Sequence, residues 1–135
     1  MIYAKNTTKH TVRHSDTDDW GIGYYGSYFA WYEAGRTELL KKIGINVRNL
    51  EQKGTLVPVL EAKNNYFAPV KFEDQLTLES ALTEIGNTHF KVDFTLSRGK
   101  QVLSMGHTVH VFTDKKLKKK KIHEKMAALK KRHEK

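Results

Sequence analysis

The chain has 135 residues, of which 39% are hydrophobic, and this suffices for one domain with a buried core. It contains no cysteine, which excludes disulfides, thiolate metal ligands and cysteine nucleophiles. No apolar run approaches the roughly 18 residues that span a bilayer, and residues 1–12 lack the apolar segment of a secretory signal. We therefore expect a soluble, cytoplasmic protein that does not insert into a membrane.

The net charge of +9 is concentrated at one end of the chain. Residues 115–135 contain 11 Lys or Arg and 2 Glu, whereas residues 1–114 contain 13 basic and 13 acidic residues. A nucleic-acid-binding domain more usually spreads basic residues over a face of its body, so nucleic acid is not the expected partner. The sequence predicts a neutral domain over residues 1–114, followed by a basic C-terminal tail over residues 115–135.

The first half of the chain predicts a strand and a long helix. Residues 8–15 contain β-branched side chains without Gly or Pro, which favours a strand. Residues 25–43 carry residues of an apolar face three or four positions apart, which predicts an amphipathic helix; they are Tyr28, Trp31, Tyr32, Gly35, Leu39 and Ile43. Gly44 suits the left-handed position that ends a helix. Asn46 suits the N-cap of a short helix that runs to Lys53.

The second half predicts four strands, over residues 56–68, 75–85, 89–97 and 101–113. The short turns between the last three imply antiparallel neighbours. Together with the helix, these strands predict an α+β fold in which a five-stranded antiparallel sheet wraps one long central helix. Such a sheet leaves an edge uncovered, which favours a homo-oligomer.

Three aspartates and two glycines lie in residues 16–23, directly before the long helix. The N-terminus of a helix presents unpaired N–H groups and the positive end of its dipole, which can stabilise a developing oxyanion. A nearby carboxylate can then act as a nucleophile or activate water. The commoner role of aspartates at this position is to cap the helix, and we expect that role for Asp16.

Two motifs carry a specific resemblance. Residues 16–36 read Asp16-Thr17-Asp18-x-x-Gly21, then Tyr28, then Trp31-Tyr32-Glu33-x-x-Arg36; residues 66–74 read Tyr66-Phe67-Ala68-Pro69 and then Asp74. This pattern resembles the signature of the 4-hydroxybenzoyl-CoA thioesterase family, and especially its short bacterial acyl-CoA thioesterase branch. The resemblance covers about residues 8–113, with the family's order of elements.

The resemblance implies a hotdog fold, a homodimer or homotetramer, and an active site at the dimer interface with no metal or cofactor. The reaction would be the hydrolysis of an acyl-CoA thioester to the free acid and CoA. By this resemblance Asp18 is the catalytic carboxylate, either as nucleophile or as the group that directs water. The oxyanion donor corresponds to the backbone N–H of Tyr25. The substrate-binding residues would be Gly21, Tyr28, Trp31 and Tyr32.

One position departs from the family pattern. Many short-chain members carry His where this chain has Tyr25, so a side-chain hydrogen bond from a His to the thioester is lost here while the backbone donor remains. The acyl group, and the choice between CoA and acyl carrier protein, therefore stay open.

Three other functions fit the sequence less well than hydrolysis. A non-catalytic acyl-CoA-binding or nucleic-acid-binding protein on the same scaffold would not need Asp18, and a dehydratase of this fold would be expected to carry a catalytic His in residues 25–43, which have none. The seven His are scattered, and His107 and His110 would point to opposite faces of a strand, so no metal site is expected. In the tail, Ile122, Met126 and Leu129 have helical spacing, and the Lys and Arg residues suit the phosphates of CoA.

Overall fold

The computed structural model describes residues 1–134. Within them, five strands form one sheet: β1 (Ala4–Thr11), β2 (Val59–Tyr66), β3 (Gln75–Ile85), β4 (His89–Arg98) and β5 (Gln101–Val111). Three α-helices accompany the sheet: α1 (Ser27–Lys42), α2 (Val47–Gln52) and α3 (Glu124–His133). A short 3-10 turn, η1 (His14–Asp16), follows β1.

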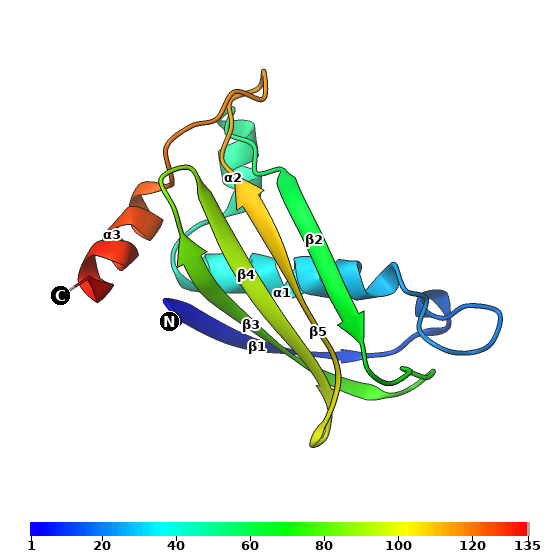
Figure 1. The fold of residues 1–135 in the computed structure, drawn as a ribbon. Helices are drawn as coiled ribbons and strands as arrows, with labels where there is room; N and C mark the ends of the chain where they lie inside the picture. Colours follow the sequence, from blue (N-terminus) through cyan, green and yellow to red (C-terminus); the bar gives the residue numbers. More distant parts are fainter. Residues whose placement is uncertain (135) are drawn as a thin grey trace.

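The sheet is antiparallel throughout, with strand order β1-β3-β4-β5-β2. The long helix α1 crosses one face of this sheet (Figure 1). Alternation along β4 explains which face is inward, because its buried side chains are two positions apart; they are Phe90, Val92, Phe94 and Leu96. The predicted α+β architecture, with a five-stranded sheet against one long helix, is confirmed.

The face of α1 that contacts the sheet is the one that the spacing predicts. Its buried residues are Tyr28, Trp31, Tyr32, Gly35, Leu39 and Leu40. Tyr32 stacks on Phe94, with ring centroids 4.4 Å apart. At Gly35 an added Cβ would lie 2.6 Å from side-chain atoms of Leu78 and Ser80, so the close approach of helix and sheet requires a residue without a side chain.

The predicted C-terminus of α1 and the predicted N-cap of α2 are confirmed. Gly44 has a φ of +89°, and Ile45 N–H donates to the Leu40 carbonyl at 2.8 Å, which closes the C-terminus of α1. The side chain of Asn46 accepts from Asn49 N–H at 3.1 Å and so caps α2.

The predicted bounds of the first strand are wrong. The strand runs from Ala4 to Thr11 rather than over residues 8–15, because Asp16 N–H and Thr17 N–H donate to the carbonyls of Arg13 and His14 and turn the chain into η1. The helix α1 begins at Ser27, two residues later than expected, and β2 begins only after Pro58, which has no N–H to donate.

The C-terminal helix α3 belongs to the core. Met126 is 0% exposed, and Ile122 and Leu129 pack against the same hydrophobic cluster. Figure 1 shows α3 beside the end of the sheet, next to the N-terminus, where the rings of Tyr3 and His133 lie 5.2 Å apart. The helical spacing in the tail is therefore confirmed, with its apolar face packed inward. None of the helices in residues 1–134 combines the length and apolar character needed to cross a bilayer.

Candidate active site

The loop between η1 and α1 is a small closed turn around Asp18. Asp18 N–H donates to the Ile22 carbonyl at 2.8 Å, and Gly21 N–H donates to the Asp18 carbonyl at 3.1 Å. Gly21 has a φ of +79°, a conformation that other residues rarely adopt. The loop is fixed to the chain beyond β2, because Gly23 N–H donates to the Val70 carbonyl at 2.7 Å. The position of Asp18 is thus set by backbone hydrogen bonds.

The two carboxylate oxygens of Asp18 have different environments. Oδ1 accepts hydrogen bonds from Trp20 N–H at 2.9 Å and from Ile22 N–H at 3.3 Å. Among the hydrogen bonds of residues 1–134, none involves Oδ2. One oxygen therefore orients the side chain and the other is free to accept a proton or attack a carbon.

Asp16 has a different environment from Asp18. Its Oδ2 accepts from the ring of His10 at 2.9 Å and from Arg13 N–H at 2.8 Å. Its carbonyl accepts from Tyr24 N–H at 2.8 Å and from the Ser27 hydroxyl at 3.0 Å. Burial alone would raise the pKa of Asp16, but these hydrogen bonds and the positive charges of His10 and Arg13 lower it. Asp16 therefore has a structural role, but it does not cap α1, whose N-cap is Gly26 without a side-chain hydrogen bond. Its carboxylate instead holds η1.

An open cavity of about 370 Å³ lies between the Asp18 loop, the start of α1 and the segment after β2. Its lining is mostly apolar and aromatic, with Asp18 as its carboxylate; the lining residues are Asp18, Ile22, Gly23, Tyr25, Tyr28, Tyr66, Phe67, Ala68 and Pro69. Small-molecule sites typically have volumes of about 300 to 1,000 Å³ with a few polar groups in an apolar lining. The size and composition of this cavity fit that description.

Tyr25 offers a backbone donor to the same cavity. It lies two residues before the first residue of α1, and within the described residues its N–H donates to no protein acceptor. Its carbonyl accepts a hydrogen bond from the Tyr66 hydroxyl at 3.0 Å, which holds the peptide in place. Tyr25 as a whole is 66% exposed, and its ring packs on that of Tyr24 with centroids 4.6 Å apart.

The other sequence-predicted residues are distributed over three places. Tyr28 lines the Asp18 cavity, whereas Trp31 lines a separate cavity of about 80 Å³ that also contains His10. Tyr32 lines neither cavity; its hydroxyl donates to the Asn64 side chain and lies 2.8 Å from the Ser104 hydroxyl in the core. Burial raises the pKa of Tyr32 to about 12. Gly21 shapes the turn and is not part of the cavity lining.

Aromatic rings separate the Asp18 cavity from the smaller cavity. The ring centroids of Tyr66 and Tyr28 are 4.7 Å apart, those of Tyr28 and Trp31 are 5.0 Å apart, and those of Trp31 and His10 are 5.2 Å apart. Burial raises the pKa of Tyr28, so this hydroxyl stays protonated at neutral pH. This row of rings, here called the aromatic wall, lies between the two cavities.

The sequence analysis did not predict that residues 66–69 belong to the site. Tyr66, Phe67, Ala68 and Pro69 line the cavity, although the sequence offered them only as a second motif of the resemblance. The available signal was the aromatic pair Tyr66-Phe67, close before Pro69 at the end of the predicted strand 56–68.

Comparison with known proteins identifies the superfamily and the fold of this domain. Residues 12–129 match the family model of the Thioesterase-like superfamily. The structure superposes on 4-hydroxybenzoyl CoA thioesterase from Pseudomonas sp. strain CBS-3 with a TM-score of 0.83 and 19% sequence identity, over 93% of this chain and 99% of that chain. The architecture is therefore the hotdog fold, with a carboxylate-bearing cavity at the mouth of its central helix. The chain belongs to the Thioesterase-like superfamily.

Two relatives show how far the sequence likeness extends. A 61-residue segment is 39% identical to YneP of Bacillus subtilis (strain 168) and covers 45% of this chain and 44% of that protein. The 1,4-dihydroxy-2-naphthoyl-CoA hydrolase of Synechococcus elongatus is 25% identical over 105 residues, which are 76% of this chain and 77% of that protein. The aligned segment thus spans less than half of YneP but about three quarters of the hydrolase.

Proposed function

We propose that this protein hydrolyses acyl-CoA thioesters to the free acid and CoA, with Asp18 as its catalytic carboxylate. The observation that carries this proposal is that two residues with unpartnered groups line one cavity of about 370 Å³: within residues 1–134, Asp18 Oδ2 accepts no hydrogen bond and Tyr25 N–H donates none. A nucleophile or base and an oxyanion donor are the two groups that acyl transfer needs. Membership of the Thioesterase-like superfamily and the name of the Synechococcus hydrolase support the same reaction.

In one form of the reaction Asp18 directs a water molecule to the thioester. Asp18 takes a proton from water as the water oxygen bonds to the thioester carbon, and Tyr25 N–H donates to the carbonyl oxygen as it becomes negative. The tetrahedral intermediate then collapses, the carbon–sulfur bond breaks, and CoA leaves with the proton that Asp18 held. In the nucleophilic form Asp18 itself bonds to the carbon and CoA leaves as a thiolate. Water then hydrolyses the anhydride, which restores the Asp18 carboxylate, releases the acid and supplies the proton that the thiolate takes.

The substrate contacts follow from the cavity. We propose that Tyr28 contacts the acyl group directly, and that Gly21 acts through the shape of the Asp18 loop. Trp31 would act from behind Tyr28 as part of the aromatic wall, and Tyr32 by holding α1 against the sheet. The wall limits the depth of the cavity, which favours short or compact aromatic acyl groups over long chains.

We also propose that the active form is a homodimer joined along β2. This strand is one edge of the sheet, and its residues Val59 and Leu60 are 51% and 56% exposed in the single chain. Phe67, in the cavity lining just beyond β2, is 58% exposed. A strand edge with exposed apolar side chains at one end is often covered by another chain, and a second copy would then cover the open side of the cavity. We place the reaction in the cytoplasm, since the chain has no cysteine.

The direct test is a hydrolysis screen over short, long and aromatic acyl-CoAs, with release of the CoA thiol as the readout. We expect turnover of at least one class by the wild type and none above background by Asp18→Asn. If no acyl-CoA is hydrolysed while the same compounds bind, the chain is a non-catalytic acyl-CoA binder.

A further inference from the structure

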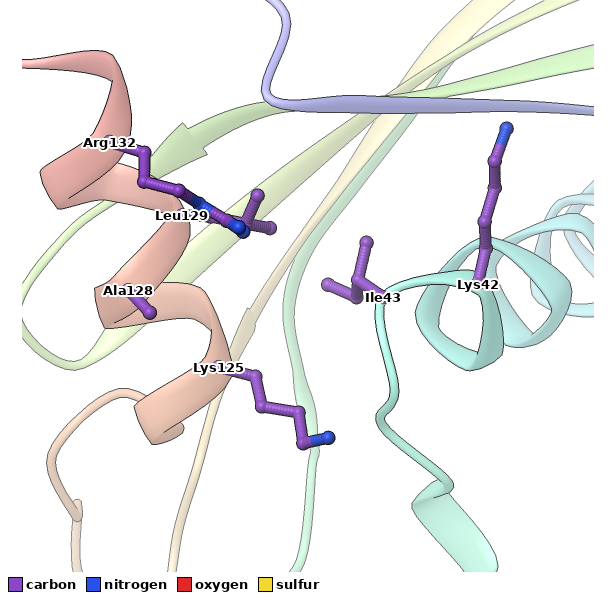
Figure 2. Close-up of a pocket in the computed structure, with 6 residues that line it drawn as sticks. All are labelled: Lys42, Ile43, Lys125, Ala128, Leu129 and Arg132. Carbon is purple, nitrogen blue, oxygen red and sulfur yellow. The ribbon is translucent and has the colours of Figure 1, made fainter.

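A second large cavity lies at the opposite end of α1 from Asp18. It has a volume of about 480 Å³ and separates the C-terminal end of α1 from α3. Figure 2 shows Ile43, just after α1, facing Leu129 and Arg132 of α3 across the gap, while Lys42 points toward β1. The lining residues are Lys42, Ile43, Lys125, Ala128, Leu129 and Arg132.

The lining of this cleft is cationic and contains no acidic residue. Lys42, Lys125 and Arg132 take part in none of the ion pairs found within residues 1–134. Lys42 donates one hydrogen bond, to the Lys5 carbonyl at 2.7 Å, which leaves its other N–H groups available. Three like charges around one hollow create a positive potential that an anion would neutralise.

The backbone is arranged so that these charges can gather. An added Cβ at Gly44 would lie 2.6 Å from the Lys125 amine, so the absence of a side chain at Gly44 leaves the room that this amine occupies. Lys125 and Arg132 are seven residues apart on α3, which separates them by about 10 Å along the helix axis. Ala128 and Leu129 lie between them and, with Ile43, give the cleft an apolar floor.

The size and charge of the cleft favour an organic phosphate over a single carboxylate. A volume of about 480 Å³ falls in the range of small-ligand sites, about 300 to 1,000 Å³. Three cations exceed what a single carboxylate needs, and the guanidinium of Arg132 has the fork geometry that binds phosphate oxygens in pairs. The apolar floor suits the organic part of such a ligand.

We propose that the cleft between α1 and α3 binds a phosphorylated small molecule of nucleotide size. Its phosphates would contact Lys42, Lys125 and Arg132, and its organic part would lie on Ile43, Ala128 and Leu129. The 16 residues of α1 span about 24 Å, so within one chain this site is remote from Asp18. The proposal therefore does not depend on the proposed hydrolysis.

The test is a calorimetric titration of the full-length protein with adenosine 3′,5′-bisphosphate, with uncharged adenosine as the reference ligand. We expect the bisphosphate to bind, adenosine to bind far more weakly, and the double variant Lys125→Ala/Arg132→Ala to raise the Kd at least about tenfold, since two charge-assisted contacts are lost. The variant Asp18→Asn should bind with an unchanged Kd.

The matched control is Lys121→Ala/Lys131→Ala. It also removes two exposed cations from residues 115–134, but from positions outside the cleft lining. We expect its Kd within about twofold of the wild type at 0.15 M salt, because neither side chain lines the cleft and salt weakens the attraction of exposed charges that do not contact the ligand. Equal loss in both double variants would show general attraction by the basic tail and overturn the site. Undetectable binding of the bisphosphate to the wild type would overturn it too, as would tighter binding of duplex DNA that both double variants weaken equally.

Discussion

Asp18 uses one carboxylate oxygen to hold its own loop and leaves the other free, and this division allows a sharp substitution. In Asp18→Asn the amide oxygen can still accept from Trp20 N–H and Ile22 N–H, so the loop should keep its shape. The amide can neither accept a proton nor attack a thioester. We expect kcat to fall by about two to four decades with little change in thermal stability, measured by CoA release and by thermal unfolding.

The control for this substitution is Asp19→Asn. Asp19 is an exposed carboxylate of the same loop and does not line the cavity, so its loss changes the charge of the loop alone. We expect kcat within about twofold of the wild type, since surface substitutions away from a site have small effects. Equal losses in both variants would mean that loop charge, and not the Asp18 carboxylate, supports the reaction.

His110 is a buried histidine that should make the fold sensitive to acid. Burial, together with the charge of Arg36, lowers its pKa from 6.5 to about 4. Because the unfolded chain binds the proton more readily than the folded protein, the stability that neutral His110 provides is present above pH 6.5 and is lost as the pH falls toward 4. The ring stacks on Phe90 with centroids 5.1 Å apart, so Phe is a suitable replacement.

We therefore expect the unfolding free energy of His110→Phe to decline less steeply between pH 6.5 and 4 than that of the wild type. Urea titrations at several pH values measure this slope. Burial also lowers the pKa of His123, which adds to the acid sensitivity of the fold. Both proteins contain His123, so its contribution cancels when their slopes are compared. Parallel curves for the two proteins would show that His110 does not titrate in this range.

At the scale of elements, the contact between α3 and the core predicts a large effect from a single tail residue. Met126 is fully buried in the main hydrophobic cluster. Truncation of a buried Met to Ala typically costs about 2 to 5 kcal/mol, which is a large part of the roughly 5 to 15 kcal/mol that stabilises a domain. We expect Met126→Ala to lower the unfolding free energy in urea by this amount.

Lys131→Ala is the control on the same helix. Lys131 is exposed, so its removal should change the unfolding free energy by no more than about 0.5 kcal/mol. A cost below about 1 kcal/mol for Met126→Ala would show that α3 leaves the core at little expense.

The sequence predicts an element well when the spacing of its apolar residues matches the face that the element buries. The face of α1 and the alternation of β4 follow from spacing, because both elements bury large apolar side chains on one side. The start of β1 has no such signal, since its inward positions include Asn6 and Thr8. Its place is set by pairing with β3, from Ala4 opposite Leu82 to Thr11 opposite Gln75, which is a contact between distant parts of the chain.

The candidate site follows the same rule. Asp18, Tyr25 and Tyr28 are close in sequence and meet in one cavity, as the motif suggests. Trp31 is also close in sequence, but it lies behind Tyr28 and beside His10. The segment 66–69 joins the cavity because Ile22 pairs with Lys71 across the loop, and such pairing leaves no local pattern in the sequence.

At the scale of the whole molecule, the β2 edge predicts how copies assemble. Leu60 is 56% exposed and lies at an irregularity in the pairing of β2 with β5. Its side chain therefore contributes little to the stability of the single chain. A second copy would bury it. We expect the wild type to be a dimer or larger by light scattering, and Leu60→Glu to dissociate toward monomer and lose activity, since it places a charge in an apolar interface.

Ile2→Glu provides the comparison. Ile2 is 50% exposed and lies beside the opposite edge of the sheet, before β1, so the charge is introduced at an equally open position. We expect it to leave assembly and activity unchanged. A wild-type protein that is monomeric and fully active at assay concentration would contradict both the β2 interface and the interfacial position of the site.

The buried position of Met126 also bears on the order in which the molecule can be built. Synthesis proceeds from the N-terminus, so all five strands and α1 leave the ribosome before the helix that completes their core. Until then the apolar surface that Met126 covers faces water, and the nascent domain is open to aggregation or proteolysis. The same surface would reappear in a mature protein whose C-terminal helix is cleaved or displaced, so a helix within the basic tail also completes the core of the fold.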